Sequence, residues 1–301
     1  MNSTLLSCSS NSSVEQHMYP TVYSLFFIVG FPANCLSLFV AWKLALQGNN
    51  MAVYLVSLCV SDLLYTVTLP VWIGMAQRWN VSDQLCGVMY LIMYNSFYVG
   101  SGLLCCISVD RYLAVVYPLH FHWVREVRAA ALLSAAVWLL EIFLHIVLLH
   151  HMGALQSFNL CHQPMPLTWK DANVALVRVV VSFLFPLVVM TTHLAVKANR
   201  ATMDEEQLRI SKLLTMVLLC LLVCFGPIHV AFMVRMLLDG CEGFKWFLCI
   251  YKVSTAISTM NCLADPLLYC FITRTGQENI QQVLLFFLRK QKRTEGINCI
   301  S

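Results

Sequence analysis

The fold of this chain is decided by one stretch, Cys105-Cys106-Ile107-Ser108-Val109-Asp110-Arg111-Tyr112-Leu113-Ala114-Val115-Val116-Tyr117-Pro118. Asp110 and Arg111 stand side by side at the end of an apolar run that begins near Cys86. Such a pair is ordinary on the surface of a soluble protein, but at the end of a membrane helix it is costly and is kept where it has a function. The stretch therefore predicts a membrane-spanning helix with a functional ion pair at one end.

The composition of the whole chain is that of a membrane protein. Of 301 residues, 59% are hydrophobic and 11% charged, against roughly 25% charged in soluble domains, and the mean hydropathy is +0.72. Seven apolar stretches are long enough to cross a hydrocarbon core of about 30 Å as helices: 19–44, 51–75, 85–113, 129–149, 174–196, 208–238 and 247–272. No strand-like alternation accompanies them. We expect an all-α membrane protein with a seven-transmembrane helix bundle over residues 19–273, then a short amphipathic eighth helix and a cytoplasmic tail over 274–301.

The basic residues give the bundle a direction. Of the 19 lysines and arginines, 13 would lie on the side shared with the C-terminus and 6 on the other side or within helices. Because cytoplasmic loops are enriched in Lys and Arg, we expect a cytoplasmic C-terminus and an extracellular N-terminus over residues 1–18. Glycosylation sequons at Asn2, Asn11 and Asn80 all fall on the predicted outer side. No basic tract interleaved with aromatic residues points to nucleic acid.

Several motifs along the chain together resemble one family. They are Asn34 in the first stretch, Asp62 in the second, Asp110-Arg111-Tyr112 in the third, Trp138 in the fourth, and Pro186, Pro227 and Asp265-Pro266-Leu267-Leu268-Tyr269 in the last three. Over residues 19–288 the pattern resembles the rhodopsin-like (class A) G-protein-coupled receptors. The resemblance implies a plasma-membrane receptor that activates a heterotrimeric G protein, with arrestin as a further candidate partner and no enzymatic activity.

The resemblance assigns roles to the inner motifs. Asp110 would hold Arg111 in the resting state and release it to the G protein, with Tyr112 beside it. Pro227 would kink the sixth helix, and Phe225 replaces the more usual Trp before it. Asp265, Pro266 and Tyr269 would form the inner switch of the seventh helix, and Leu194 stands where the family usually has a Tyr.

Glu141 narrows the resemblance to a subgroup. A Glu three residues after Trp138 is similar to the proton-sensing and lysolipid-linked receptors, as are the segments 105–115, 183–186 and 261–266. The segments 46–49 and 52–55 look most like the member associated with oxidised fatty acids and lysophosphatidylcholine. The resemblance therefore implies a response to extracellular protons, to an anionic lipid, or to both.

Buried acids are the first candidate sensor. Asp62, Glu141 and Asp265 lie within apolar spans, where desolvation favours the neutral form of a carboxyl group, so at least one is expected to titrate near extracellular pH. If the helices pack as in class A, Asp62 and Asp265 approach each other near Asn34 and share a proton or a sodium ion. No other cofactor or metal is expected. Outer histidines that titrate near neutrality, chiefly His17 and His162, are the second candidate.

A lipid site is the competing prediction. Arg178, Arg235 and Lys252 would form a basic rim over an apolar pocket with His229 at its floor. Two plainer readings stay open: Arg178 extends to the membrane interface, and His229 merely bonds a neighbour.

The cysteines predict disulfide bonds on the outer side. The resemblance implies a Cys86–Cys161 disulfide, and we hypothesise a Cys8–Cys241 disulfide because the outside is oxidising. Cys299 is not in a prenylation motif, and its palmitoylation is open.

Other classes of membrane protein fit the sequence less well. A retinal-binding protein needs a lysine midway along the seventh helix, where this chain has Thr259, and no internal repeat supports a transporter. The alternatives are a class A receptor for a nucleotide or peptide and, further off, a membrane transporter; the proline framework also disfavours an intramembrane enzyme.

Overall fold

The computed structural model describes residues 13–116, 120–121, 123, 126–151, 176–177, 179–198, 205–235 and 240–272. No strand occurs in these ranges. Their helices, in chain order, are α1 (Ser13–Leu46), α2 (Asn50–Thr66), α3 (Leu69–Ala76), α4 (Asp83–Val116), α5 (Val127–His151), the π-helical η3 (Val180–Leu184), α8 (Phe185–Ala198), α9 (Glu205–Cys220), the π-helical η4 (Leu221–Phe225), α10 (Gly226–Arg235), α11 (Gly240–Ser258) and α12 (Asn261–Ile272).

These helices group into seven rods that follow the predicted spans. The second rod joins α2 to α3, the fifth η3 to α8, the sixth α9, η4 and α10, and the seventh α11 to α12. By length and apolar composition, four described helices can each cross a membrane: His17–Leu46, Asn50–Ala76, Asp83–Leu113 and Val127–Val147. Thr215–Ala231 in the sixth rod is a shorter apolar helix. The predicted eighth helix lies outside the described residues.

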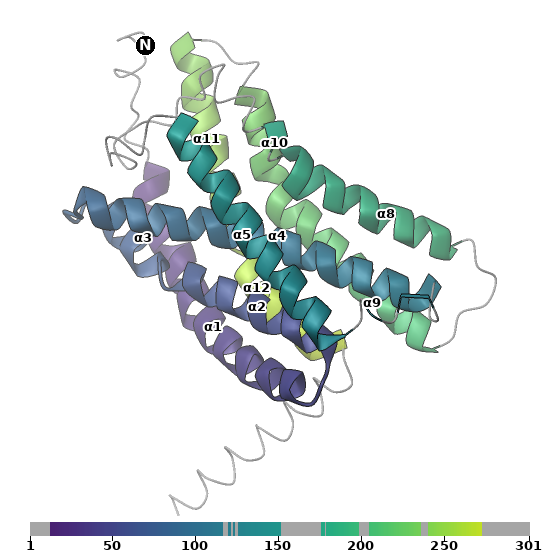
Figure 1. Ribbon diagram of the computed structural model, residues 1–301. Helices are drawn as coiled ribbons and strands as arrows, with labels where there is room; N and C mark the ends of the chain where they lie inside the picture. Colours follow the sequence, from purple (N-terminus) through teal and green to yellow (C-terminus); the bar gives the residue numbers. More distant parts are fainter. Residues whose placement is uncertain are drawn as a thin grey trace, which may run out of the picture.

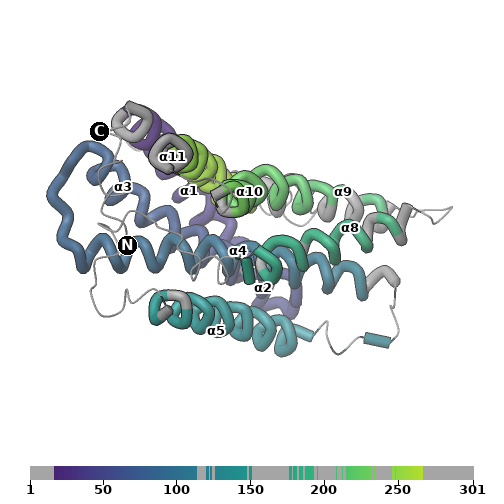
Figure 2. Tube along the Cα trace, turned by 90° about the horizontal axis from the view of Figure 1, so that it is seen from above, coloured from purple at the N-terminus to yellow at the C-terminus, as the bar shows by residue number. Residues whose placement is uncertain are grey.

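The rods pack as a bundle around α4. Helix α4 contacts α2, α5, α8 and α9, while α1 contacts α2, α3, α11 and α12. Figures 1 and 2 show α4 running obliquely through the bundle with α5 along its outside. The arrangement brings α2, α4, α9 and α12 to a common interior, which is where the predicted polar residues lie.

Glycine, proline and capping residues explain where the rods end and where they break. Gly48, at φ 87°, allows the tight turn between α1 and α2, and the Asn49 side chain caps α2 by accepting from the Ala52 amide at 3.3 Å. Pro70 lies in the first turn of α3, where a proline costs no hydrogen bond. Each π-helical segment comes just before a proline, Pro186 after η3 and Pro227 after η4. A change of helical form thus precedes Pro227, where the kink is predicted.

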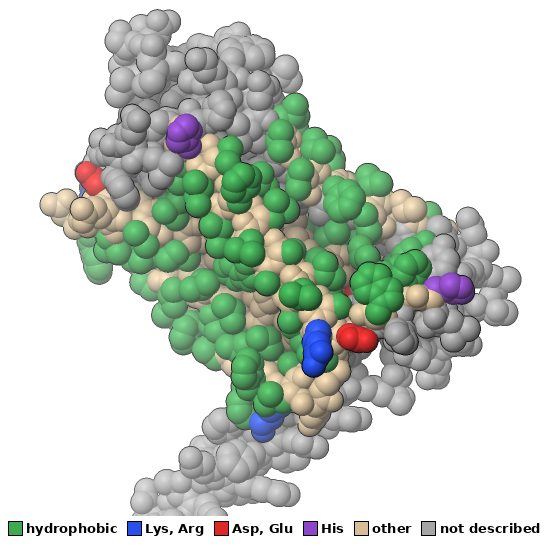
Figure 3. Space-filling view, in the orientation of Figure 1, with side chains coloured by type: hydrophobic (Ala, Val, Ile, Leu, Met, Phe, Trp, Pro, Cys, Tyr) green, Lys and Arg blue, Asp and Glu red, His purple; other side chains and the backbone are tan. Residues whose placement is uncertain are grey.

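The core has an outer and an inner part, and the outside of the bundle is apolar. The outer part is tyrosine-rich and includes Tyr23, Tyr65, Tyr94 and Tyr98; the inner part is mostly aliphatic and includes Leu55, Leu103, Leu221 and Phe225. Large hydrophobic side chains such as Leu132, Leu139, Phe143 and Val188 face outward. Figure 3 shows hydrophobic side chains covering most of the described part of one face, as lipid contact requires.

Candidate functional site

The ion pair of the third rod forms near the end of α4. Arg111 Nε donates to Asp110 Oδ2 at 2.9 Å, and a second guanidinium nitrogen contacts the same oxygen. Asn50 Nδ2, at the start of α2, donates to Asp110 Oδ1 at 2.7 Å. The Asp110 side chain is 1% exposed and that of Arg111 18%. Asp110 is therefore held on both oxygens while Arg111 keeps an accessible edge. Tyr112 beside them is half-buried.

The structure brings Asp62 of α2 and Asp265 of α12 together in the centre of the bundle. Both are nearly inaccessible, at 5% and 4% exposure, and they lie close enough for their carboxyl groups to interact electrostatically. Asn261 Nδ2 donates to Asp265 Oδ2 at 2.8 Å. Asp62 Oδ2 and Asp265 Oδ1 have no hydrogen-bond partner within the described part of the chain. The pair therefore retains unused capacity to bind a proton or a cation.

Asn34 and Pro266 support this pair from α1 and α12. Asn34 Nδ2 donates to the Gly30 carbonyl at 3.0 Å and to the Cys262 carbonyl at 2.7 Å, which ties α1 to α12. Pro266, directly after Asp265, is buried within α12. Asn34 therefore contacts α12 at the turn before Asp265, and its part in the proton or sodium site stays a prediction.

A sodium ion fits this part of the structure in chemical terms. Asp62 lines a small cavity together with Ser96 and Asn261, residues that carry carboxylate, hydroxyl and amide oxygens. Hard cations prefer oxygen ligands. Among the described residues, no group of three or more His, Cys, Asp or Glu side chains forms a metal site. Sodium binding at Asp62 stays a prediction.

Helix α5 carries a polar buried face that holds Glu141. Its buried residues are Ala130, Ser134, Glu141, His145 and Leu149, which fall on one side of a helix. One turn after Glu141, the His145 ring meets the Tyr94 ring edge-on with centroids 6.1 Å apart. The sequence analysis missed His145, although its spacing of four from Glu141 was a usable signal. Trp138 anchors this helix by donating to Ser57 Oγ of α2 at 2.9 Å.

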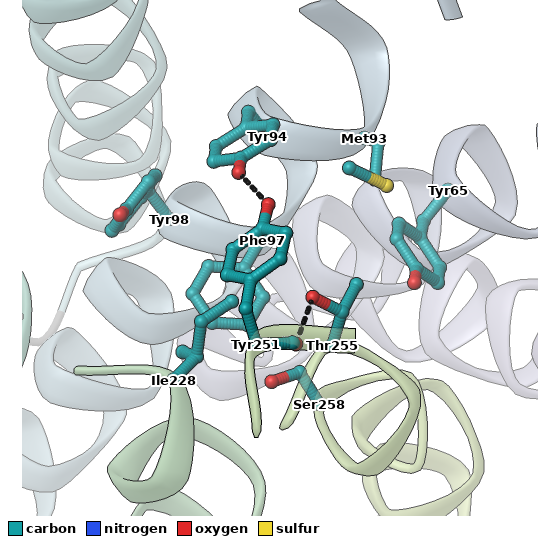
Figure 4. A pocket seen from close by; sticks show the side chains of 9 residues that line it. All are labelled: Tyr65, Met93, Tyr94, Phe97, Tyr98, Ile228, Tyr251, Thr255 and Ser258. Carbon is teal, nitrogen blue, oxygen red and sulfur yellow. Dashed lines mark hydrogen bonds between the residues drawn. The ribbon is translucent and has the colours of Figure 1, made fainter. Parts of the chain in front are cut away.

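A small cavity lies on the outer side of the acid pair (Figure 4). It is lined by Tyr65, Met93, Tyr94, Phe97, Tyr98, Ile228, Tyr251, Thr255 and Ser258. The hydroxyls of Tyr94 and Tyr251 are hydrogen-bonded to each other, and Thr255 Oγ1 donates to the Tyr251 carbonyl at 2.9 Å. The described lining combines aromatic rings with hydroxyl groups and holds no charged side chain. Tyr65, Phe97 and Ser258 also line the cavity at Asp62, so the two spaces adjoin.

His229 lies behind the wall of this cavity. It is 2% exposed, stacks on Phe183 with centroids 4.8 Å apart, and lies 6.2 Å from the Phe97 and Tyr98 rings. Its Nδ1 is 2.7 Å from the Phe225 carbonyl oxygen, so Nδ1 carries a proton and donates. His229 is thus hydrogen-bonded to a neighbour on its own rod, and its contact with a ligand stays a prediction. Phe225 itself is buried against Phe97, with centroids 4.3 Å apart.

Of the three residues predicted to form the basic rim, the structure describes the side chain of Lys252 alone. Lys252 is half-buried on α11 next to Tyr251, and its carbonyl accepts from the Tyr19 hydroxyl at 3.3 Å. Arg178 and the side chains of Arg235 and Tyr269 lie outside the described part of the chain, as does Leu194's side chain.

Some of the residues predicted to lie on the extracellular side belong to the described part of the chain. His17 is exposed on α1, and Asn80 is exposed in the turn after α3. Cys86 is disulfide-bonded, and its partner lies outside the described residues. The remaining outer positions also lie outside them: Asn2, Cys8, Asn11, Cys161, His162 and the side chain of Cys241.

Comparison with known proteins agrees with this architecture. The family described as "7 transmembrane receptor (rhodopsin family)" matches residues 33–269, which confirms the predicted fold. G-protein coupled receptor 65 of Homo sapiens is 36% identical over 95% of this chain and 91% of its own. G-protein coupled receptor 68 of Bos taurus is 33% identical over 94% and 81%, and Lysophosphatidic acid receptor 6 of Homo sapiens 27% over 91% and 86%.

Proposed function

Since the chain belongs to the rhodopsin family of seven-transmembrane receptors, we propose that it activates a heterotrimeric G protein in response to extracellular protons, and that an anionic lipid acts on it as well. Membership of a receptor family agrees with the prediction that the chain is not an enzyme. The protein is a multi-pass membrane protein. We place its N-terminus outside the cell and its C-terminus in the cytoplasm, on the distribution of lysines and arginines.

One observation carries the proton response: Asp62 and Asp265 are buried together without a basic partner. Among the residues that the structure describes, the ion pair is that of Asp110 with Arg111, so no basic side chain of this part of the chain neutralises the two acids. Two adjacent carboxylates in a low-dielectric interior cannot both be ionised at low cost. Together they take up a proton, and the number of protons they hold depends on pH.

Proton uptake by this pair would favour the active arrangement by removing repulsion between α2 and α12. Helix α9 packs against α12, so closer packing of α2 and α12 would change the surface that α9 contacts. The sixth rod has a π-helical segment followed by Pro227 at this depth, a place where a helix bends readily. An outward swing of α9 would open the inner end, and Arg111 would leave Asp110 for the G protein. Protonation biases an equilibrium between two states.

The lipid response is supported by the outer cavity and by a relative. The cavity is lined by aromatic rings and hydroxyl groups, which suits an apolar chain with a few polar atoms, and Lys252 lies one residue from its wall. A relative is named for lysophosphatidic acid. We therefore assign the apolar part of an oxidised fatty acid or lysophospholipid to this cavity and its anionic head to Lys252 and Arg178. Arrestin binding would use the same inner surface as the G protein.

The proton response is tested by signalling assays in lipid-stripped medium stepped from about pH 8 to about pH 6, the range in which histidines and shifted carboxyl groups titrate. Wild type should signal more strongly as the pH falls. Asp265→Asn and Glu141→Gln imitate protonated acids, so both should raise the signal at about pH 8 and flatten the curve. Ser134→Ala, a change on the same buried face of α5 as Glu141, is the control and should follow wild type. A wild-type response that stays flat over this range contradicts the proposal.

The lipid response has a separate test. Arg178→Ala should remove activation by lysophospholipid or oxidised fatty acid at constant pH, because the anionic head loses its counter-charge, while surface expression and the acid response persist. An unchanged lipid dose curve in the variant would refute the role of Arg178.

A further inference from the structure

A lysine lies on the lipid-facing side of α1, in the last turn of that helix. The outward side chains of this part of α1 include Phe39, Trp42 and Leu46, which are 49%, 56% and 74% exposed, and Lys43 is exposed among them. Their spacing of three and four residues places all four on one side of the helix. Because Leu46 continues the apolar side beyond Lys43, the lysine belongs to the surface that faces lipid.

The ammonium group of this lysine is held over an aromatic ring. Lys43 Nζ lies 4.3 Å from the centroid of the Phe39 ring, one turn earlier in α1. The side chain is therefore directed back along the helix, toward the middle of the membrane. A lysine that only reaches for water extends the other way, past the helix end. Since a cation–π contact is stronger where water is scarce, the charge is kept one turn inside the end of α1.

No carboxylate from the described part of the chain forms an ion pair with this lysine. The ion pair of that part is Arg111 with Asp110, and the Asp110 carboxylate accepts from both Arg111 and Asn50. A charge at the edge of the hydrocarbon layer is costly without a counter-ion. The side of α1 that carries Lys43 is open to lipid, so a lipid head group can supply that counter-ion.

A second cation lies on the other side of the start of α2. Arg128 is exposed in the first turn of α5, and α2 contacts both α1 and α5. Figure 3 shows basic side chains toward the lower end of the apolar face, in the region where Figure 1 places the end of α1 and the start of α5. Glu126 is exposed two residues before Arg128, but residues two apart on a helix do not face each other. Positive charge thus borders this end of the bundle at two places.

We propose that this side of α1 binds an acidic phospholipid of the inner leaflet, with the Lys43 ammonium on the anionic head group and the acyl chains along Phe39 and Trp42. Arg128 adds attraction from across α2. Lysines and arginines at the cytoplasmic ends of membrane helices attract anionic lipids in this way. The leaflet follows from the orientation proposed above. The site itself is separate from the outer cavity and does not depend on the proton response or on an activating lipid.

The first test is native mass spectrometry of the purified receptor, offered equal amounts of phosphatidylserine and phosphatidylcholine with identical acyl chains. The ratio of the two lipids is measured for receptor that carries one lipid, and wild type should favour phosphatidylserine. Lys43→Gln should lower the ratio about fivefold, which corresponds to about 1 kcal/mol, whereas Lys43→Arg should keep it. Phe39→Leu retains the charge but loses the ring, so it should lower the ratio by a smaller factor.

Another lysine supplies the matched control. Lys212 is also exposed, on α9, and among the described residues the cation–π contact is that of Lys43. Lys212→Gln therefore removes the same charge and leaves the proposed site intact, so the lipid ratio should stay close to that of wild type. Equal losses in Lys212→Gln and Lys43→Gln would mean general attraction of anionic lipid only and would overturn the proposal, as would an unchanged ratio in Lys43→Gln.

Fluorescence quenching locates the lipid in a bilayer. The receptor is placed in phosphatidylcholine nanodiscs that contain a small, fixed fraction of phosphatidylserine, and either the phosphatidylserine or an equal amount of phosphatidylcholine carries brominated acyl chains. The contribution of Trp42 is the difference between wild type and Trp42→Phe. Brominated phosphatidylserine should quench Trp42 more strongly than brominated phosphatidylcholine, and Lys43→Gln should make the two equal. Equal quenching of Trp42 by the two lipids in wild type would contradict the proposed site.

Discussion

At the scale of single residues, the clearest prediction concerns Asp110, because Arg111 and Asn50 both donate hydrogen bonds to its carboxylate. Asp110→Asn removes the charge that retains Arg111 and should raise basal G-protein activation several-fold; a charge-assisted bond of this kind contributes about 1.5–3 kcal/mol. Asn50→Ala removes only the second donor and should raise basal activity less. The measurement is basal nucleotide exchange at constant expression. Equal basal activity in all three proteins would show that Asp110 does not restrain Arg111.

The hydroxyl pair at the outer cavity gives a second residue-scale prediction. Tyr94→Phe leaves the aromatic packing in place and removes the bond to Tyr251 that joins α4 to α11. The purified receptor should lose about 1 kcal/mol of stability, seen as a melting temperature lower by a few degrees. Tyr98→Phe, which keeps the Tyr94–Tyr251 bond, is the comparison. A Tyr94→Phe melting curve that coincides with wild type would mean that this bond contributes nothing.

Sequence reasoning found the residues with unusual chemistry and missed those whose role comes from neighbours. Asp62 and Asp265 stood out because a carboxyl group in an apolar span is costly, and the structure brings them together. Tyr94 and Tyr251 are unremarkable in a sequence rich in tyrosine. Only the packing of α4 near α11 makes them partners.

At the scale of helices, the contact between α4 and α5 depends on a glycine. A methyl group at Gly102 would meet Val137 Cγ1 at 2.8 Å, whereas one at Gly100 would find its nearest neighbour at 3.7 Å. Gly102→Ala should therefore destabilise the bundle by about 1–3 kcal/mol through overpacking, while Gly100→Ala should be neutral or slightly stabilising because alanine favours the helix. Thermal unfolding measures both.

A second substitution should partly reverse the loss of stability in Gly102→Ala. Val137→Ala removes the obstructing methyl group, so the double variant Gly102→Ala/Val137→Ala should recover part of the lost melting temperature. If Gly102→Ala and Gly100→Ala melt alike, close approach of α4 and α5 at this point is not important.

The helices themselves were largely predictable, and their interruptions were less so. Apolar length placed the spans, since a membrane crossing needs about 20 residues; the span expected over 85–113 is α4, Asp83–Val116. The breaks after Thr66 and after Ser258 and the π-helical forms of η3 and η4 were not predicted. Proline shows where a backbone bond is missing, but the helical form that results depends on contacts from neighbouring rods.

At the scale of the whole molecule, the features form one path through the membrane. The hydroxyl-lined cavity adjoins the space at Asp62. Asn261 donates to Asp265 and accepts a hydrogen bond from the thiol of Cys220 on the sixth rod, and Asn50 and Arg111 hold Asp110 near the end of α4. A change of protonation in the middle can therefore act on both the outer cavity and the inner ion pair. By linkage, a lipid that favours the active state should also shift the pH response.

That linkage is a prediction for the whole receptor. A saturating activating lipid should move the midpoint of the acid response toward alkaline pH, because both ligands stabilise the same state. Parallel pH titrations of signalling with and without lipid measure the shift. Midpoints that agree, with only the amplitude changed, would mean that lipid and proton act on separate equilibria.

The most direct measurement is nucleotide exchange on a G protein by the purified receptor in nanodiscs of neutral synthetic phosphatidylcholine, titrated from about pH 8 to about pH 6. The receptor-dependent rate should rise as the pH falls in wild type, and it should be high and nearly independent of pH when Asp62→Asn and Asp265→Asn are combined. The G protein's own pH dependence is subtracted with receptor-free discs. A wild-type rate that does not change with pH, or a double variant that titrates like wild type, would contradict proton sensing by the buried acid pair.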